Sequence, residues 1–229
     1  DQGARRKRLG FRPIRETRGE RAFGLWPTRK DFYRLFHVEE GLGTKNLVAD
    51  AVYAFTGDPS VYRGISQDTI AMIINDMATL GAFPLSLQMH LAVGSSDWFK
   101  DERRSGAIIE GWRNACLEAR CVWAGGETPA LKNIVNPETF VIAGSAVGVT
   151  KKGHRRLGAH RIKAGDAIMI ASAPGVNANG LTLCRDIASH MSARYQTLLN
   201  PSQFGAVVGG PPSYGTALLS PTPLYSALV

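Results

Sequence analysis

The chain of 229 residues is poor in cysteine and has no long apolar run. Its three cysteines are odd in number and show no Cys-x-x-Cys spacing, which argues against a disulfide scaffold or a zinc finger and is typical of a reducing compartment. The longest nearly uncharged apolar stretch, residues 140–149, is too short to span a bilayer. No signal peptide is recognisable at the start, so we expect a soluble, cytoplasmic protein without a membrane partner.

Several common catalytic motifs are also missing. The sequence contains no Gly-x-Ser-x-Gly elbow, no His-Glu-x-x-His and no Gly-x-Gly-x-x-Gly, and its five histidines include no metal-spaced pair. Serine hydrolases of the elbow type, zinc proteases and nicotinamide-binding enzymes therefore have no support.

Acidic residues are scarce at the N-terminus. Residues 1–30 hold ten basic residues against three acidic ones, a net +7 of the total +8, so the rest of the chain is nearly neutral. A basic arm over residues 1–34 could contact nucleic acid or another anion, and it could equally be a solvated tail. Aromatic residues are rare among these bases, so nucleic acid is not the expected partner.

Strand-like and helix-like segments alternate along the rest of the chain, which predicts an α+β (mixed α/β) fold. A loop bounded by Pro59 and Gly64 precedes the first predicted helix, and a Pro/Gly-rich linker is expected over 200–213. The expected strands are 32–38, 84–93, 121–124, 140–149 and 167–171, and the expected helices are 66–80, 102–119 and 181–191.

The first candidate site follows a predicted strand, at Glu40-Gly-Leu-Gly-Thr-Lys45. Gly41 and Gly43 allow the backbone to approach a ligand closely, Thr44 and Lys45 can bind phosphate oxygens, and Glu40 can hold a divalent cation. A tight hairpin with incidental polar residues is the alternative.

The second candidate is the polar face of the helix predicted at 66–80. Asp68, Asn75 and Asp76 share this face at helical spacing, and oxygen ligands of this kind suit Mg²⁺. The alternative is an ordinary solvated face of an amphipathic helix.

Two glycine-containing turns complete the set. Gly125-Gly126-Glu127-Thr128 ends a predicted strand and pairs a close-approach backbone with a carboxylate. Residues 174–180 precede a helix, where free amides could bind an anion. A plain glycine turn and an asparagine-capped loop are the respective alternatives.

Taken in order, these motifs resemble the PurM-like superfamily, and best the N-terminal domain of the aminoimidazole ribonucleotide (AIR) synthetase family, the phosphoribosylformylglycinamidine cyclo-ligases. The family patterns are DGVGTK, G-x-D-x-x-A-M-x-x-N-D, G-A-x-P-L, G-G-E-T and S-x-G-x-H-S-N-G-Y-S-L. The corresponding segments here are 40–45, 68–76, 81–85, 125–128 and 174–183, and 217–222 resembles the A-L-L-x-P-T that opens the family's second domain.

The resemblance implies an ATP- and Mg²⁺-dependent ligase of purine biosynthesis that phosphorylates an amide oxygen before a nitrogen attacks. Its substrate would be a ribonucleotide amide or amidine. It implies an ATP-binding domain at 35–199, the linker and start of a truncated second domain at 200–229, and a homodimer in which two sheets form a closed barrel. By position, Lys45 and Asp76 would be catalytic. The cofactor would be bound by Gly41, Gly43, Thr44, Lys45, Asn75, Gly125, Gly126 and Thr128, and the metal by Glu40, Asp68, Asp76 and Glu127.

The sequence departs from the family pattern at three positions. Glu40 stands where the family has aspartate, Asn177 replaces a histidine, and Pro129 replaces an alanine. Another PurM-like enzyme, of the thiamine-monophosphate kinase or hydrogenase-maturation type, stays an alternative. So does an inactive dimeric or nucleic-acid-binding module.

Overall fold

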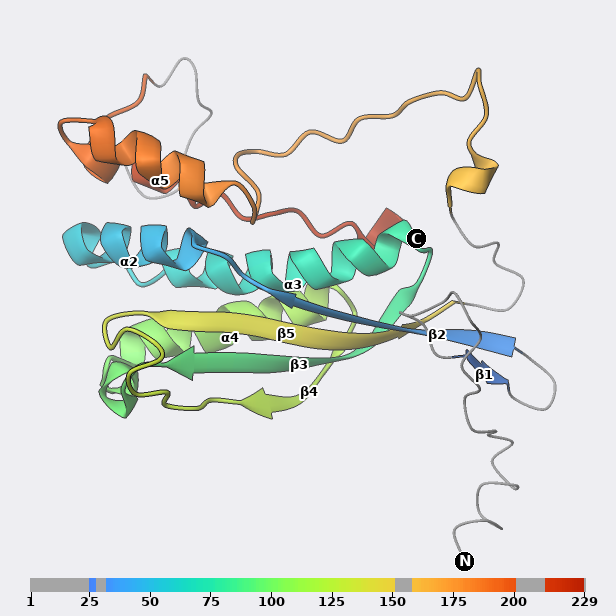
Figure 1. The fold of residues 1–229 in the computed structure, drawn as a ribbon, viewed down its shortest axis with the longest axis horizontal. Coiled ribbons are helices and arrows are strands. Elements are labelled where there is room, and N and C mark those ends of the chain that lie inside the picture. Colours follow the sequence, from blue (N-terminus) through green and yellow to red (C-terminus); the bar gives the residue numbers. More distant parts are fainter. Residues whose placement is uncertain (1–24, 28–31, 151–157, 201–212, 229) are drawn as a thin grey trace, which may run out of the picture.

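A mixed five-stranded sheet forms the centre of the protein (Figure 1). The computed structural model describes residues 25–27, 32–150, 158–200 and 213–228. In their order across the sheet, the strands are β1 (Leu25–Pro27), β2 (Phe32–Gly41), β5 (Phe140–Val149), β3 (Phe83–Val93) and β4 (Val122–Glu127).

Strand directions bring the sequence motifs to one edge of the sheet. β5 is antiparallel to both β2 and β3, and β4 is parallel to β3. β2, β3 and β4 therefore run in the same direction, and their carboxyl ends lie at the same edge. We call this the motif edge, made of residues 40–45, 94–96 and 125–128.

The helices cover one face of this sheet. They are α2 (Lys45–Thr56), α3 (Val61–Thr79) and α4 (Glu102–Glu118), and α3 packs against β2, β5 and α4. Buried residues of β5 alternate from Phe140 to Ala146, as expected for a strand with one covered face. The core beneath includes Ile73, Met77 and Trp112.

A further layer lies on the side of α2 and α3 away from the sheet (Figure 1). It contains α5 (Leu181–His190), the short α6 (Tyr214–Leu218) and the last residues of the described chain. α6 contacts α2, the last residues contact α3, and α5 contacts α6. Single 3₁₀ turns are η1 (Ser96–Lys100), η2 (Ala159–Arg161), η3 (Arg194–Gln196) and η4 (Ser226–Leu228). Within the described ranges, no helix has the length and apolarity needed to cross a membrane.

The mixed α/β architecture is confirmed, as are the strands at 84–93 and 140–149 and the helices at 102–119 and 181–191, to within a residue or two. The domain boundaries at 34 and 199 stay predictions. Most of the basic arm, and all of 201–212 in the expected linker, lie outside the described residues.

Two element predictions were wrong, and one helix was not predicted. Residues 167–171 form no strand, and Ile168, Met169 and Ile170 are 89–94% exposed, because no other described strand pairs with them. The sequence analysis missed helix α2, since its start was interpreted only as a phosphate loop. α3 begins at Val61, so Gly64 lies inside the helix, where a Cβ would come within 3.2 Å of the Pro221 ring.

The second face of the sheet carries no helix among the described residues. We call it the open face. It mixes small and apolar side chains with polar ones: Leu35, His37, Glu39, Gln88, His90, Val122, Val141, Ala143, Ser145, Val147 and Val149.

A substitution at Gly144 tests the packing between the sheet and its helices. A Cβ at this position would lie 2.8 Å from the Gln88 carbonyl oxygen and 2.9 Å from the Trp112 ring. Gly144→Ala should therefore lower the free energy of unfolding by about 1–3 kcal/mol, measured by urea denaturation. The control is Gly106→Ala in α4, where a Cβ meets no atom within 4 Å and should stabilise the helix by about 0.5–1 kcal/mol. Equal stability of the two variants would contradict this packing.

Candidate functional site

Lys45 begins helix α2, yet its side chain is fully buried. Its ammonium group donates hydrogen bonds to Asp68 Oδ1 at 3.0 Å, to the Val176 carbonyl at 3.0 Å and to the Ser220 carbonyl at 2.8 Å. An ammonium group has three N–H donors, so all three are used by residues of this chain.

Asp68 is the counter-ion, also fully buried on α3. Its Oδ2 lies 2.9 Å from Lys45 Nζ, and its Oδ1 accepts bonds from the Thr222 amide at 2.9 Å and the Thr222 hydroxyl at 2.5 Å. Burial lowers the pKa of Lys45 and raises the pKa of Asp68, while their mutual attraction opposes both shifts. The three acceptors around Nζ require a protonated amine, so we describe the two groups as an ion pair.

The polar face of α3 also binds residues 219–225, which we call the C-terminal segment. Gln67 Nε2 donates to the Thr222 carbonyl at 3.0 Å. Asn75 donates to the Pro223 carbonyl at 3.0 Å and accepts from the Tyr225 amide at 2.9 Å. This segment runs along α3 (Figure 1) and occupies Asp68 and Asn75 on the face predicted to hold Mg²⁺, while Asp76 on the same face is exposed.

The N-terminus of α2 at the motif edge has no side-chain cap. Thr44 precedes the helix without making a capping bond, and the first turn contains no acidic residue. The buried Thr44 Oγ1 finds no hydrogen-bond partner among the described residues. A helix start with free amides and no nearby carboxylate in its first turn is suited to an anion. Gly41 and Gly43, just before it, are exposed.

The diglycine at the end of β4 has a backbone that other residues rarely adopt. Gly125 and Gly126 have φ of +124° and +156°, and a Cβ on Gly126 would lie 2.0 Å from the Met89 carbonyl oxygen. Glycine is therefore required for β4 to pair with β3 at this position. Glu127 and Thr128 follow at the motif edge, both exposed.

The four carboxylates predicted to bind the metal do not come together. Glu40 lies across from Gly144 on the helix-covered face, whereas Glu127 lies across from His90 on the open face. Asp76 is exposed and follows Asp68 by two helical turns, about 12 Å along the axis. Among the described residues, no group of three or more His, Cys, Asp or Glu side chains is placed to hold a metal ion.

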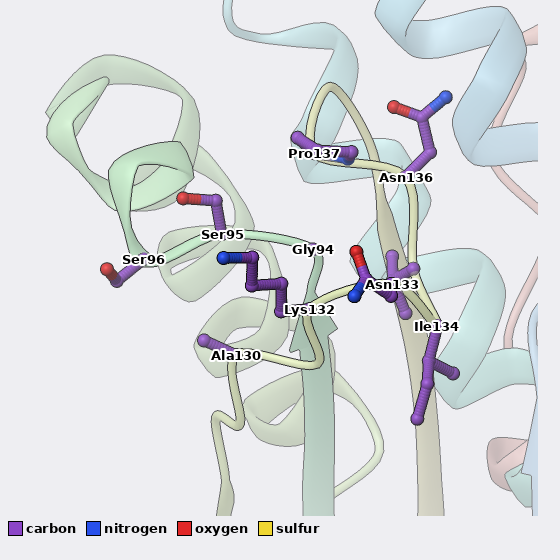
Figure 2. Close-up of a pocket in the computed structure, with 10 residues that line it drawn as sticks. Gly94, Ser95, Ser96, Ala130, Lys132, Asn133, Ile134, Asn136 and Pro137 are labelled. Atoms are coloured by element: carbon purple, nitrogen blue, oxygen red, sulfur yellow. The ribbon is translucent and has the colours of Figure 1, made fainter.

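Two cavities lie near these residues. One, of about 720 Å³, is at the motif edge beside the end of β3, where Lys132, Ser95 and Asn133 line it (Figure 2). The other, of about 1090 Å³, lies between helices α2 to α4 and the layer that contains residues 174–176 and 214–221. The first is within the size range of small-molecule sites, and the second lies slightly above its upper end.

The buried thiols do not offer a nucleophile. Burial raises the pKa of Cys116 to about 12 and that of Cys121 to about 11, so both stay protonated near neutral pH.

Sequence reasoning missed the partners of the Lys45–Asp68 pair. Val176, Ser220 and Thr222 contribute backbone or hydroxyl groups. The sequence predicted residues 174–180 only as an anion-binding turn, and it gave Ser220 and Thr222 no place in the site. The A-L-L-x-P-T likeness at 217–222 marked the segment, but a pattern of residue types does not show which helix a segment contacts.

Breaking the buried ion pair should cost stability. Asp68→Asn or Lys45→Met leaves one buried charge without its partner, and each should lower the free energy of unfolding by about 3–5 kcal/mol in urea denaturation. The control is Asp76→Asn, a similar change at an exposed carboxylate without a hydrogen bond to the described residues, expected within about 0.5 kcal/mol of the unchanged protein. A loss below about 1 kcal/mol for both buried variants would contradict the pairing.

Comparison with known proteins agrees with the motif order. Residues 39–150 match the family model described as AIR synthase related protein, N-terminal domain. The chain is similar to a phosphoribosylformylglycinamidine cyclo-ligase of Carboxydothermus hydrogenoformans, at 32% identity over 186 residues, which is 81% of this chain and 49% of the relative. A cyclo-ligase of Sorangium cellulosum is 34% identical over 190 residues, which is 83% of this chain and 49% of that relative.

Among solved structures, thiamine monophosphate kinase from Aquifex aeolicus aligns with a TM-score of 0.36 and 17% identity, over 54% of this chain and 37% of that one. The chain spans about half the length of these two cyclo-ligases. Family model and sequence relatives agree, and residues 39–150 therefore form an N-terminal domain of the AIR synthase related family.

Proposed function

We propose that this chain is the ATP-binding part of a cytoplasmic ligase of the cyclo-ligase type, acting on a ribonucleotide amide or amidine. The observation that carries the proposal is the motif edge. Three parallel strands bring residues 40–45, 94–96 and 125–128 to one side of the sheet, next to the uncapped start of α2. Ligands of open sheets bind at the carboxyl ends of strands. The identity to cyclo-ligases supports the choice of reaction.

The triphosphate would bind at the N-terminus of α2. Its first-turn amides, the exposed Gly41 and Gly43, and the unpartnered Thr44 hydroxyl together fit a phosphate group. Gly125 and Gly126 would form a second close-approach surface, with Thr128 beside it. Lys45 and Asn75 do not fit this role as they stand, because their polar groups are already bonded to the chain.

Catalysis would depend mainly on positioning ATP and the substrate relative to each other. The terminal phosphoryl group of ATP passes to an amide oxygen of the substrate, forming an O–P bond as the bond to ADP breaks. A nitrogen of the substrate then attacks the activated carbon, loses a proton and expels inorganic phosphate. No protein nucleophile is required, in keeping with the protonated state of Cys116 and Cys121.

Mg²⁺ is part of the proposal because ATP chemistry in this family implies it. Bound Mg²⁺ would neutralise charge on the triphosphate. The donor set does not fit as predicted, because Glu40 and Glu127 lie on opposite faces of the sheet and Asp68 is fully buried in its ion pair with Lys45. No step is therefore derived through the ion.

Dimerisation would use the open face. Val141, Val147 and Val149 place apolar surface there, and no described helix covers it. Two copies packed through this face would form the barrel that the resemblance implies and would bury His90 and Glu127 near the contact.

ATP titration by calorimetry, with and without Mg²⁺, tests the nucleotide site. We expect binding that requires Mg²⁺ and that weakens at least tenfold in Gly43→Asp, because a carboxylate before α2 repels phosphate. Gly106→Asp is the matched control, since a Cβ at either glycine meets no atom within 4 Å. Asp76→Ala separately tests the metal role that the resemblance gives this exposed carboxylate, because loss of Mg²⁺-dependent binding would place Asp76 at the ion.

Three results would count against the proposal. The unchanged protein could fail to bind ATP, or Gly43→Asp could bind as well as Gly106→Asp. Binding that survives Asp76→Ala would remove that residue from the site. Phosphate release with formylglycinamidine ribonucleotide then tests the substrate class.

Light scattering after size-exclusion chromatography tests the open face. We expect a dimer, and Val147→Lys should give a monomer because it places a charge at the centre of the contact. Leu117→Lys, at a 62% exposed position on α4, should remain dimeric. A monomeric unchanged protein, or a dimeric Val147→Lys, would exclude this interface.

A further inference from the structure

We propose that Lys45 and Asp68 are positioning residues that anchor the C-terminal segment and residues 174–180 to helix α3, and that they do not bind the nucleotide or its cation. The inference rests on the proposed function only in saying what the pair does not bind. The anchoring itself is inferred from contacts within this chain.

The first argument is that all three donors of Lys45 and one carboxylate oxygen of Asp68 are used within the chain, and that both side chains are fully buried. Lys45 uses its three N–H donors on Asp68, Val176 and Ser220, at 2.8–3.0 Å. Asp68 Oδ1 accepts from Lys45 and twice from Thr222. Its Oδ2 lies 2.9 Å from Lys45 Nζ and has no hydrogen-bond partner among the described residues. Because both side chains are fully buried beneath residues 220–222, a phosphate or metal ion could reach either group only after this segment moves. Moving it would break the hydrogen bonds that compensate the two buried charges.

The breadth of the contact is the second argument. Gln67, Asp68 and Asn75 lie along two turns of α3 and bond to backbone groups of residues 222–225. Amide and carboxylate side chains that bind backbone N–H and C=O groups hold a segment in one register. The face of α3 is thus shaped to hold a peptide backbone.

Close packing between the two anchored pieces is the third argument. A Cβ at Gly175 would lie 2.7 Å from Ser220 Cβ and 3.2 Å from the Ala217 carbonyl oxygen. A Cβ at Gly64 would lie 3.2 Å from the Pro221 ring. Loop 174–180 and the C-terminal segment are therefore in direct contact with each other, and the segment is also in direct contact with α3.

The anchoring has a structural consequence for the site. Residues 174–176 and 218–221 form part of the wall of the cavity of about 1090 Å³, and loop 174–180 leads into α5. The ion pair at the start of α2 thus fixes the layer containing α5 beside the motif edge. In this inference, Lys45 connects the motif edge to the layer that contains α5 and binds no ligand.

Amide hydrogen exchange on the whole chain tests the anchoring. Asp68→Asn and Thr222→Val should each speed exchange of the Thr222 and Tyr225 amides about tenfold or more relative to the amides of β5. Thr222→Ser keeps the hydroxyl and should restore slow exchange. Thr79→Val is the matched control on the same helix, because the Thr79 hydroxyl bonds only to its own helix at the Asp76 carbonyl.

Unchanged exchange in Asp68→Asn or Thr222→Val would overturn the inference, and so would failure of Thr222→Ser to restore protection. ATP titration of Thr222→Val gives an independent result. Binding within about threefold of the unchanged protein supports the inference, whereas loss of binding with unaltered exchange assigns the pair to the ligand and overturns it. If the unchanged protein does not bind ATP, the proposed function fails while the exchange data still decide the anchoring.

Discussion

Burying an ammonium and a carboxylate together constrains most of this structure. Each charge loses its hydration, so each must be compensated within the protein by an opposite charge and a full set of hydrogen bonds. Lys45 and Asp68 obtain these from α2, α3, residue 176 and residues 220–222, segments far apart in the sequence. The pair can form only when the sheet-and-helix body and the layer above it are assembled in one arrangement.

The sheet is the second constraint, because the directions of its strands determine which residues lie together at the motif edge. Parallel β2, β3 and β4 place the uncapped start of α2 on the same side as the diglycine of β4. The same alternation of side chains sends Glu40 and Glu127 to opposite faces. A carboxylate on the open face can approach groups of the helix-covered face only around the edge of the sheet, unless a second copy of the chain supplies the carboxylate.

Much of the fold could be predicted from local pattern, and the site only in part. Hydrophobic periodicity located β3, β5, α4 and α5, because one face of each element is buried. It failed for Asp68, which the helical wheel placed on a polar face open to solvent or metal, since a wheel shows one helix and not the segment that covers it. Residues 167–171 have strand composition but no strand to pair with among the described residues. The motifs indicated the diglycine, but its φ angles and its contact with Met89 appear only in three dimensions.

A crystal structure of the chain with Mg²⁺ and a non-hydrolysable ATP analogue tests the central claim most directly. The account predicts phosphate density at residues 41–44, with Lys45 Nζ still about 3 Å from Asp68 and the Ser220 carbonyl. Lys45 Nζ on a phosphate oxygen, with residues 219–225 displaced from α3, would contradict it.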